Sequence, residues 1–269
     1  LGESDASQYE APFAQVDRTV RVFREENPRS WYRAEWWQHY AQRPALRKAC
    51  APLPRFLATP RVTKHRLFVW LAAPTVPDCQ LIVFARSDDY FFGVLHSRVH
   101  EVWARAQGTQ LRERESGFRY TPTTCFETFP FPRPTPVQEA AIAEAAKELD
   151  SLRNNWLNPP EWTQEEILEF PGSADGPWAR YVHESDERGI GTVRWPRIVP
   201  RPGGYDTMLR KRTLTNLYNE RPTWLRLSHE KLDAVVFTAY GWDPGISDDD
   251  LLAKLLDLNL SRAAEEAGS

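Results

Sequence analysis

The chain has 269 residues and a net charge of −3, with 41% hydrophobic and 26% charged residues, a composition that supports a folded core and argues against disorder. Its longest apolar run, residues 67–76, is too short for the roughly 20 residues that span a bilayer, and no basic segment precedes an apolar one at the start. The three cysteines form no CxxC pair, so we expect neither a disulfide framework nor a zinc site, but a soluble cytoplasmic protein without membrane contact.

The first predicted elements are helices. Over residues 11–48 apolar side chains recur at three- and four-residue steps, and Pro28 interrupts the pattern. Two short apolar runs follow, at residues 67–71 and 81–84, separated by prolines. These runs predict two strands joined by a turn.

The middle of the chain alternates between helix and loop. Asp88 or Asp89 can cap a helix that ends at Gly108. Residues 109–132 predict a loop with a short strand. A proline at the first turn then favours a helix over residues 136–153.

The C-terminal third begins with residues 157–205, which are rich in Pro, Gly, Trp and charge and predict a long ordered loop or a linker. Beyond them, residues 205–218, 227–240 and 247–262 predict three helices. We therefore expect an α+β fold, with a mixed small-sheet domain, flanking helices and a helical C-terminal region.

Charge is spread unevenly along the chain. Residues 51–132 carry ten Lys and Arg against seven Asp and Glu, whereas residues 133–269 carry sixteen against twenty-three. A weakly basic middle beside an acidic remainder is compatible with DNA contact at one place only.

One motif invites a catalytic interpretation. Asn158-Pro159-Pro160-Glu161 is similar to the Asn-Pro-Pro-aromatic loop with which amino-methyltransferases bind the target amino group and stack on the flipped base. Here the fourth residue is Glu161, and no glycine pair follows an uninterrupted hydrophobic strand that could help to hold S-adenosylmethionine. We therefore assign no catalytic or cofactor-binding residue and interpret Asn158 as part of a helix stop.

Other catalytic motifs are weaker still. His96 and His100 lie four residues apart and could share a metal, but no third ligand is evident nearby, so core packing is favoured and we assign no metal ligand. The motifs of serine hydrolases, restriction nucleases and phosphate-binding loops are missing from the sequence.

Several motifs of this sequence resemble those of a known protein family, and they extend the functional prediction. The motif Asp88-Asp89-Tyr90-Phe91-Phe92-Gly93 with the rest of 88–103, followed by residues 119–122 and 126–132, closely resembles the specificity region of large single-chain class I DNA methyltransferases. These include the MmeI-like (type IIL) restriction-modification enzymes and related phage-defence methyltransferases. The resemblance extends to residues 36–44, 61–65, 157–160 and 212–242, and so covers nearly the whole chain.

The resemblance implies a domain order. In that family the catalytic domain, with its S-adenosylmethionine site, lies N-terminal to the specificity region, and the target is the exocyclic amino group of adenine in duplex DNA. This sequence has no such domain and begins at Leu1 rather than Met, so we expect upstream residues to be missing. We predict a helical connector over 1–50, a DNA target-recognition domain over 51–135 and a helical region over 136–269.

The residues expected to contact DNA fall into two groups. Lys and Arg side chains near a strand and along the following helix are phosphate candidates: Arg61, Lys64, Arg66, Arg98 and Arg105. Polar side chains of residues 107–124 are base-reading candidates, namely Gln110, Arg112, Arg114, Arg119, Thr121, Thr123 and Thr124. For several of them a solvated charged surface is the alternative, and we interpret residues 129–132 as a rigid brace.

Two alternatives concern the chain as a whole. It could be a stand-alone specificity subunit that docks on a separate methyltransferase chain, or an independent enzyme that uses Asn158. The preferred prediction is part of an adenine-type DNA methyltransferase, inactive alone and without its own cofactor, which binds duplex DNA in a restriction or phage-defence system.

Overall fold

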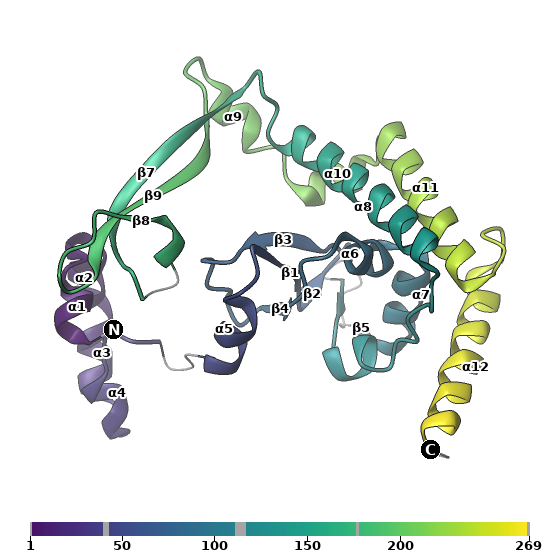
Figure 1. Cartoon of the computed structure of the whole chain (residues 1–269), viewed down its shortest axis with the longest axis horizontal. Coiled ribbons are helices and arrows are strands. Elements are labelled where there is room, and N and C mark those ends of the chain that lie inside the picture. Colours follow the sequence, from purple (N-terminus) through teal and green to yellow (C-terminus); the bar gives the residue numbers. More distant parts are fainter. Residues whose placement is uncertain (1, 40–42, 111–116, 176–177, 268–269) are drawn as a thin grey trace. The chain divides into compact units, whose positions relative to one another are not determined.

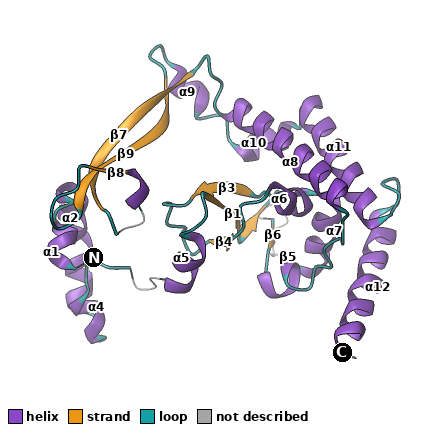
Figure 2. Cartoon of the chain, in the orientation of Figure 1, coloured by secondary structure: helices purple, strands orange, loops and turns teal. Residues whose placement is uncertain are grey.

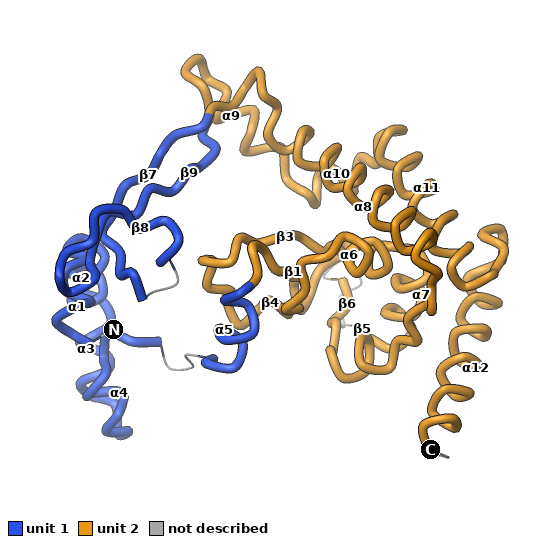
Figure 3. Tube along the Cα trace, in the orientation of Figure 1, with its two compact units in different colours: residues 1–52, 165–199 blue, residues 53–164, 200–269 orange. Residues whose placement is uncertain are grey.

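A computed structural model describes residues 2–39, 43–110, 117–175 and 178–267, except for the side chain of Gln110. The chain forms two compact units (Figure 3). Unit 1 comprises residues 1–52 and 165–199, and unit 2 comprises residues 53–164 and 200–269. Helices and small antiparallel sheets confirm the predicted α+β class (Figure 2).

The N-terminal part of unit 1 is a run of short helices: α1 (Glu3–Ser7), α2 (Glu10–Val16), α3 (Val22–Glu25), α4 (Ser30–Ala34) and α5 (Pro44–Cys50). A π-helical turn, Asp17–Arg21, joins α2 to α3. Trp36 is buried beside them, with its indole N–H donating to Glu3 Oε1 at 3.1 Å and its ring 5.2 Å from that of Phe13. The break predicted at Pro28 is confirmed, since α3 ends and α4 begins on either side of it.

The other part of unit 1 is a β-sheet in the order β7–β9–β8, built from Thr163–Ser173, Ile190–Pro200 and Val182–His183. Most of its side chains are exposed, and ion pairs such as Arg194–Glu169 at 2.9 Å link β9 to β7. The prediction of a loop over residues 157–205 is therefore wrong. Both long strands carry a proline, and they lack the one-sided apolar alternation that marks a half-buried strand.

Unit 2 contains two further sheets. The first has the order β3–β1–β4, with β1 (Arg55–Pro60) antiparallel to both β3 (Val69–Ala72) and β4 (Leu81–Phe84). The strands predicted near 67–71 and 81–84 thus exist, but β1 lies between them instead of a direct hairpin. The second sheet has the order β2–β6–β5, built from Val62–Thr63, Phe118–Arg119 and Thr109–Gln110.

The helices of unit 2 are α6 (Asp89–His96), α7 (Arg98–Gln107), α8 (Pro136–Leu157), α9 (Tyr205–Leu209), α10 (Leu214–Glu220), α11 (Thr223–Tyr240) and α12 (Asp248–Ala267) (Figure 1). Asp88 caps α6, as predicted, by accepting a hydrogen bond from the Phe91 amide at 2.8 Å. The single helix expected up to Gly108 is two helices, because Ser97 is extended and its side chain caps α7.

One hydrophobic core holds unit 2 together. Helix α6 packs on α8, and α8 packs on α11 (Figure 1). At the first contact a Cβ on Gly93 would lie 2.8 Å from Ile142 Cγ2, so glycine permits the close approach. The core runs from Leu57 to Leu255 in sequence and crosses the boundary predicted at residue 135. No helix among the described residues is long and apolar enough to cross a membrane.

Candidate nucleic-acid interface

The β2–β6–β5 sheet is the frame of the candidate interface. In its register Val62 of β2 and Thr109 of β5 both pair with Arg119 of β6. Next to this pair, Gly117 has a φ of 83°, and a Cβ there would lie 2.1 Å from the carbonyl oxygen of Thr63. Glycine is therefore required for β2 and β6 to meet in this way.

Alternation along β6 turns Arg119 outwards, since Phe118 and Tyr120 on either side are 3% and 1% exposed. The Tyr120 hydroxyl lies 3.0 Å from His100 Nε2, and His100 Nδ1 lies 2.9 Å from the carbonyl oxygen of Leu95. Burial lowers the pKa of His100 to about 3, so at neutral pH the ring is uncharged and Nδ1–H donates while Nε2 accepts. This chain of hydrogen bonds anchors the strand from the core side.

Arg66, predicted to contact phosphate, lies in the core instead, at 6% exposure. Its guanidinium donates to Thr59 Oγ1 at 3.0 Å, to the carbonyl oxygen of Phe118 at 3.1 Å and to that of Pro60. Burial lowers the pKa of Arg66 to about 10, which still leaves it protonated at neutral pH. Arg66 thus braces β1 against β6, and its role as a phosphate contact is corrected.

The two arginines of α7 that we expected to contact phosphate both have partners within the protein. Arg98 pairs with Asp248 at 2.7 Å and donates to the carbonyl oxygens of Pro244 and Ile246 at 3.0 and 2.7 Å. Its guanidinium therefore joins α7 to the α11–α12 connection, and the predicted DNA contact is corrected. Arg105 stays exposed, but its guanidinium donates twice to Glu101.

The remaining predicted cations are exposed. Arg61 precedes β2, and its carbonyl oxygen accepts a hydrogen bond from the Tyr120 amide at 2.8 Å. Neither the Arg61 nor the Arg119 side chain makes a hydrogen bond or ion pair within the part of the chain that the structure describes. Lys64 is also exposed, and its ammonium reaches Asn219 Oδ1 at 2.9 Å. Three exposed cations thus come from one pair of neighbouring strands.

The predicted base-reading hydroxyls occupy different positions. Thr124 Oγ1 donates to the carbonyl oxygen of Gln107 at 3.0 Å, so this hydroxyl helps to close the end of α7. Thr123 is exposed and Thr121 is half-buried. The remaining candidates, Arg112, Arg114 and the side chain of Gln110, lie outside what the structure describes.

Asn158 and the histidine pair take up structural positions. Asn158 stands at the C-terminus of α8, as the helix-stop interpretation expects. His96 is buried and its Nε2 lies 2.8 Å from Arg153 Nη1, while Arg153 also donates to the carbonyl oxygen of Phe68 at 3.0 Å. Burial and the Arg153 charge lower the pKa of His96, which keeps the ring neutral. Both histidines of the pair therefore pack in the core.

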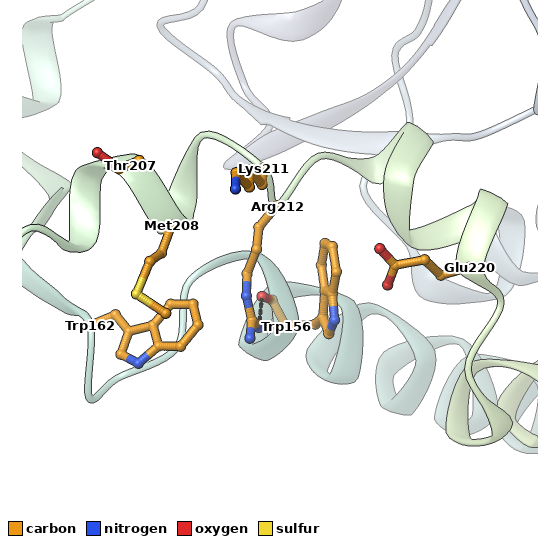
Figure 4. Close-up of a pocket in the computed structure, with 7 residues that line it drawn as sticks. All are labelled: Trp156, Trp162, Thr207, Met208, Lys211, Arg212 and Glu220. Carbon is orange, nitrogen blue, oxygen red and sulfur yellow. Dashed lines mark hydrogen bonds between the residues drawn. The ribbon is translucent and has the colours of Figure 1, made fainter.

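A cavity of about 380 Å³ lies where α8 meets the segment between α9 and α10 (Figure 4). The guanidinium carbon of Arg212 is 4.2 Å from the ring centre of Trp162 and 5.0 Å from that of Trp156, so the cation lies between the two indoles. It also donates to the carbonyl oxygen of Trp156 at 2.6 Å. This arginine therefore binds the two segments together.

Sequence reasoning missed two polar residues of the interface. His65 Nε2 lies 2.9 Å from the same Asn219 Oδ1 that Lys64 contacts. Asn219 belongs to α10 and follows His65 by 154 residues, so no local pattern links them. The one available signal is that both residues lie in segments of the noted resemblance.

Unit 2 is an α+β module that presents exposed cations around a small sheet, which the core braces from the other side. Residues 6–133 match the family described as "MmeI, target recognition domain". This match confirms the resemblance to the specificity region of MmeI-like methyltransferases inferred from the sequence.

Two further comparisons agree. The chain is 26% identical over 188 residues to DNA methyltransferase A of Bacillus subtilis (strain 168), a match that covers 69% of this chain and 15% of that protein. Its fold is similar to the type IIL restriction-modification enzyme MmeI solved in complex with DNA, with a TM-score of 0.60 and 18% identity over 93% of this chain. The chain spans 26% of that enzyme, so both relatives are much longer.

Proposed function

We propose that this chain recognises a specific sequence in duplex DNA as the specificity part of an adenine-type DNA methyltransferase of a restriction or phage-defence system. The observation that carries the proposal is the set of exposed cations that flank strand β2 or lie on its neighbour β6, within the residues that match the recognition-domain family. The structural neighbour was solved with DNA bound, which supports the same ligand.

Phosphate and base contacts need different groups. Arg61 and Lys64 flank β2 and carry charge without a carboxylate partner among the described residues, which suits contact with the sugar-phosphate backbone. Arg119 stands on a strand held by the core, so its guanidinium is positioned to approach a base edge. Arginine pairs bidentately with guanine in the major groove.

Methyl transfer would belong to a catalytic domain outside these residues, in the same polypeptide or in a separate chain, and S-adenosylmethionine would bind there. Such enzymes extract the target base from the duplex before the reaction. The recognition surface then serves to place one adenine at the entrance of that domain. Co-purification with a second polypeptide would distinguish a separate specificity subunit from a single long chain.

The test is a selection of bound duplexes from a random pool with the purified chain, followed by binding measurements at several salt concentrations. We expect one sequence to be enriched and its affinity to fall steeply with salt. Equal binding to selected and scrambled duplexes would contradict sequence recognition. If the purified chain binds no duplex at all, the whole proposal is wrong.

A further inference from the structure

A polar cluster joins the recognition sheet to the C-terminal helices. Lys64 Nζ and His65 Nε2 each lie 2.9 Å from Asn219 Oδ1. Lys64 and Asn219 are exposed, and the His65 ring lies 6.0 Å from that of Tyr218. Asn219 is outside residues 6–133, the segment that matches the recognition-domain family. Its helix, α10, therefore brings a side chain to a surface that the family match does not include.

The donors of this cluster fix its hydrogen-bond pattern. A lysine ammonium can only donate, so the atom that it contacts must be the oxygen of the Asn219 amide. His65 must then carry its proton on Nε2 and donate as well. Both lone pairs of the amide oxygen are used in this way. The Asn219 amide nitrogen has no hydrogen-bond partner within the described ranges and keeps two N–H donors.

This pattern selects a ligand chemistry. Asparagine reads adenine by donating to N7 while its oxygen accepts from the exocyclic amino group. That oxygen is already saturated by Lys64 and His65, so adenine would lack its acceptor. What remains is a neutral group with two donors beside an ammonium with two further donors. Such a set fits an anion with several acceptor oxygens, and a phosphate is the anion that DNA presents.

We propose that Lys64, His65 and Asn219 form a composite contact for one backbone phosphate of duplex DNA, in which Lys64 supplies the charge and Asn219 a neutral donor. This inference rests on the proposed function. Position supports a backbone phosphate over a free one, because Lys64 follows directly on β2, whose Val62 pairs with Arg119 of β6. His65 acts by orienting the amide and does not itself need to reach the phosphate.

The experiment measures duplex binding by the full chain with fluorescence anisotropy, on the selected duplex and a scrambled one, over a range of salt concentrations. We expect N219A to weaken binding to both duplexes by the same factor, about tenfold, as for a lost hydrogen bond to a charged group. Its salt slope should stay unchanged, because Asn219 is neutral. K64Q should instead lower the slope by about 0.9.

A negative charge placed at position 219 gives a second test. N219D should bind more weakly than N219A, since a carboxylate would face the phosphate, and its pairing with Lys64 should preserve the fold. N155D is the matched control, because Asn155 is exposed on α8 and the net charge changes equally. A double variant, K64Q/N219A, should lose less than the sum of both single losses if one phosphate is shared.

Each other outcome overturns the assignment. Binding by N219A at the wild-type level would show that the amide does not contact DNA, and a loss confined to the selected duplex would make Asn219 a base reader. Displacement of the duplex by inorganic phosphate, but not by chloride at equal ionic strength, would indicate a site for free anions. If the wild-type chain binds no duplex, the proposed function fails and this contact fails with it.

Discussion

Replacement of Arg66 by methionine tests whether this buried cation serves the fold or the DNA. Methionine keeps much of the aliphatic volume, but it leaves the carbonyl oxygens of Pro60 and Phe118 without their donor. Each buried acceptor left unpaired costs about 1–3 kcal/mol. Removing the desolvated cation offsets part of this cost, as replacements of buried ion pairs show. We expect R66M to lower the free energy of unfolding by about 2–4 kcal/mol.

The assay is urea denaturation followed by tryptophan fluorescence, together with the salt dependence of duplex binding. R66M should unfold at lower urea and, where folded, keep the wild-type salt slope. R61M is the matched control, five residues away and exposed. It should change the free energy of unfolding by less than about 0.5 kcal/mol and lower the slope by about 0.9. A normal urea midpoint with a reduced slope for R66M would refute this reasoning and restore Arg66 as a phosphate contact.

Three further predictions concern the sheet and the core. R119Q should cost about 1–3 kcal/mol of discrimination at one base pair in a duplex selection, and an equal loss at every position would indicate a phosphate contact instead. G117A should destabilise unit 2 by about 1–3 kcal/mol, because φ is 83° and a Cβ would meet Thr63; an unchanged melting temperature would contradict this. Burial raises the pKa of Asp233 to about 6 from 3.8, so the stability this group contributes is full below pH 3.8 and is lost as pH rises through 6. D233N should therefore have a free energy of unfolding about 1–3 kcal/mol above that of the wild-type protein at pH 7, and the two values should be similar near pH 4. A difference in this free energy that does not vary with pH would count against the assignment.

Local signals in the sequence predicted much of the fold. The Asp88 cap, the proline that opens α8 and the apolar runs near β3 and β4 depend on residues close together in the chain, and all were confirmed. Strand order did not follow from them. β1 lies between β3 and β4 because of pairings such as Leu57 with Trp70 and Phe84, and a linear pattern does not encode such partners.

The long strands β7 and β9 escaped prediction for a different reason. Most of their side chains are exposed, and Val193 is the only buried hydrophobic residue within these two strands, so they lack the apolar alternation of period two that marks a half-buried strand. Pro171 and Pro196 also stand within them, and proline argues against a strand in sequence reasoning. Cross-strand pairs such as Glu166 with Arg197, at 3.2 Å, become visible only once the two strands are placed together.

The candidate interface likewise depends on contacts between residues that are far apart in the sequence. Composition identified Arg61, Lys64 and Arg66 as one basic cluster, and spacing gave no means to separate them. The separation comes from an acceptor 52 residues away, the Phe118 carbonyl, which draws Arg66 inside. Arg98 stays half-buried, and it is held by Asp248, which follows it by 150 residues.

Arg66 and Arg119 lie on opposite sides of strand β6. Arg66 and His100 hold β6 from the core side through its backbone and through Tyr120, while Arg119 projects from the opposite side of the same strand. Under the proposed function Arg119 reads a base, and its side chain makes no hydrogen bond or ion pair to the rest of the described protein, so its replacement removes no folding contact of that kind. Substitutions at Arg119 should therefore alter which base pair is preferred at little cost in stability, whereas the same substitutions at Arg66 would loosen the strand that positions Arg119.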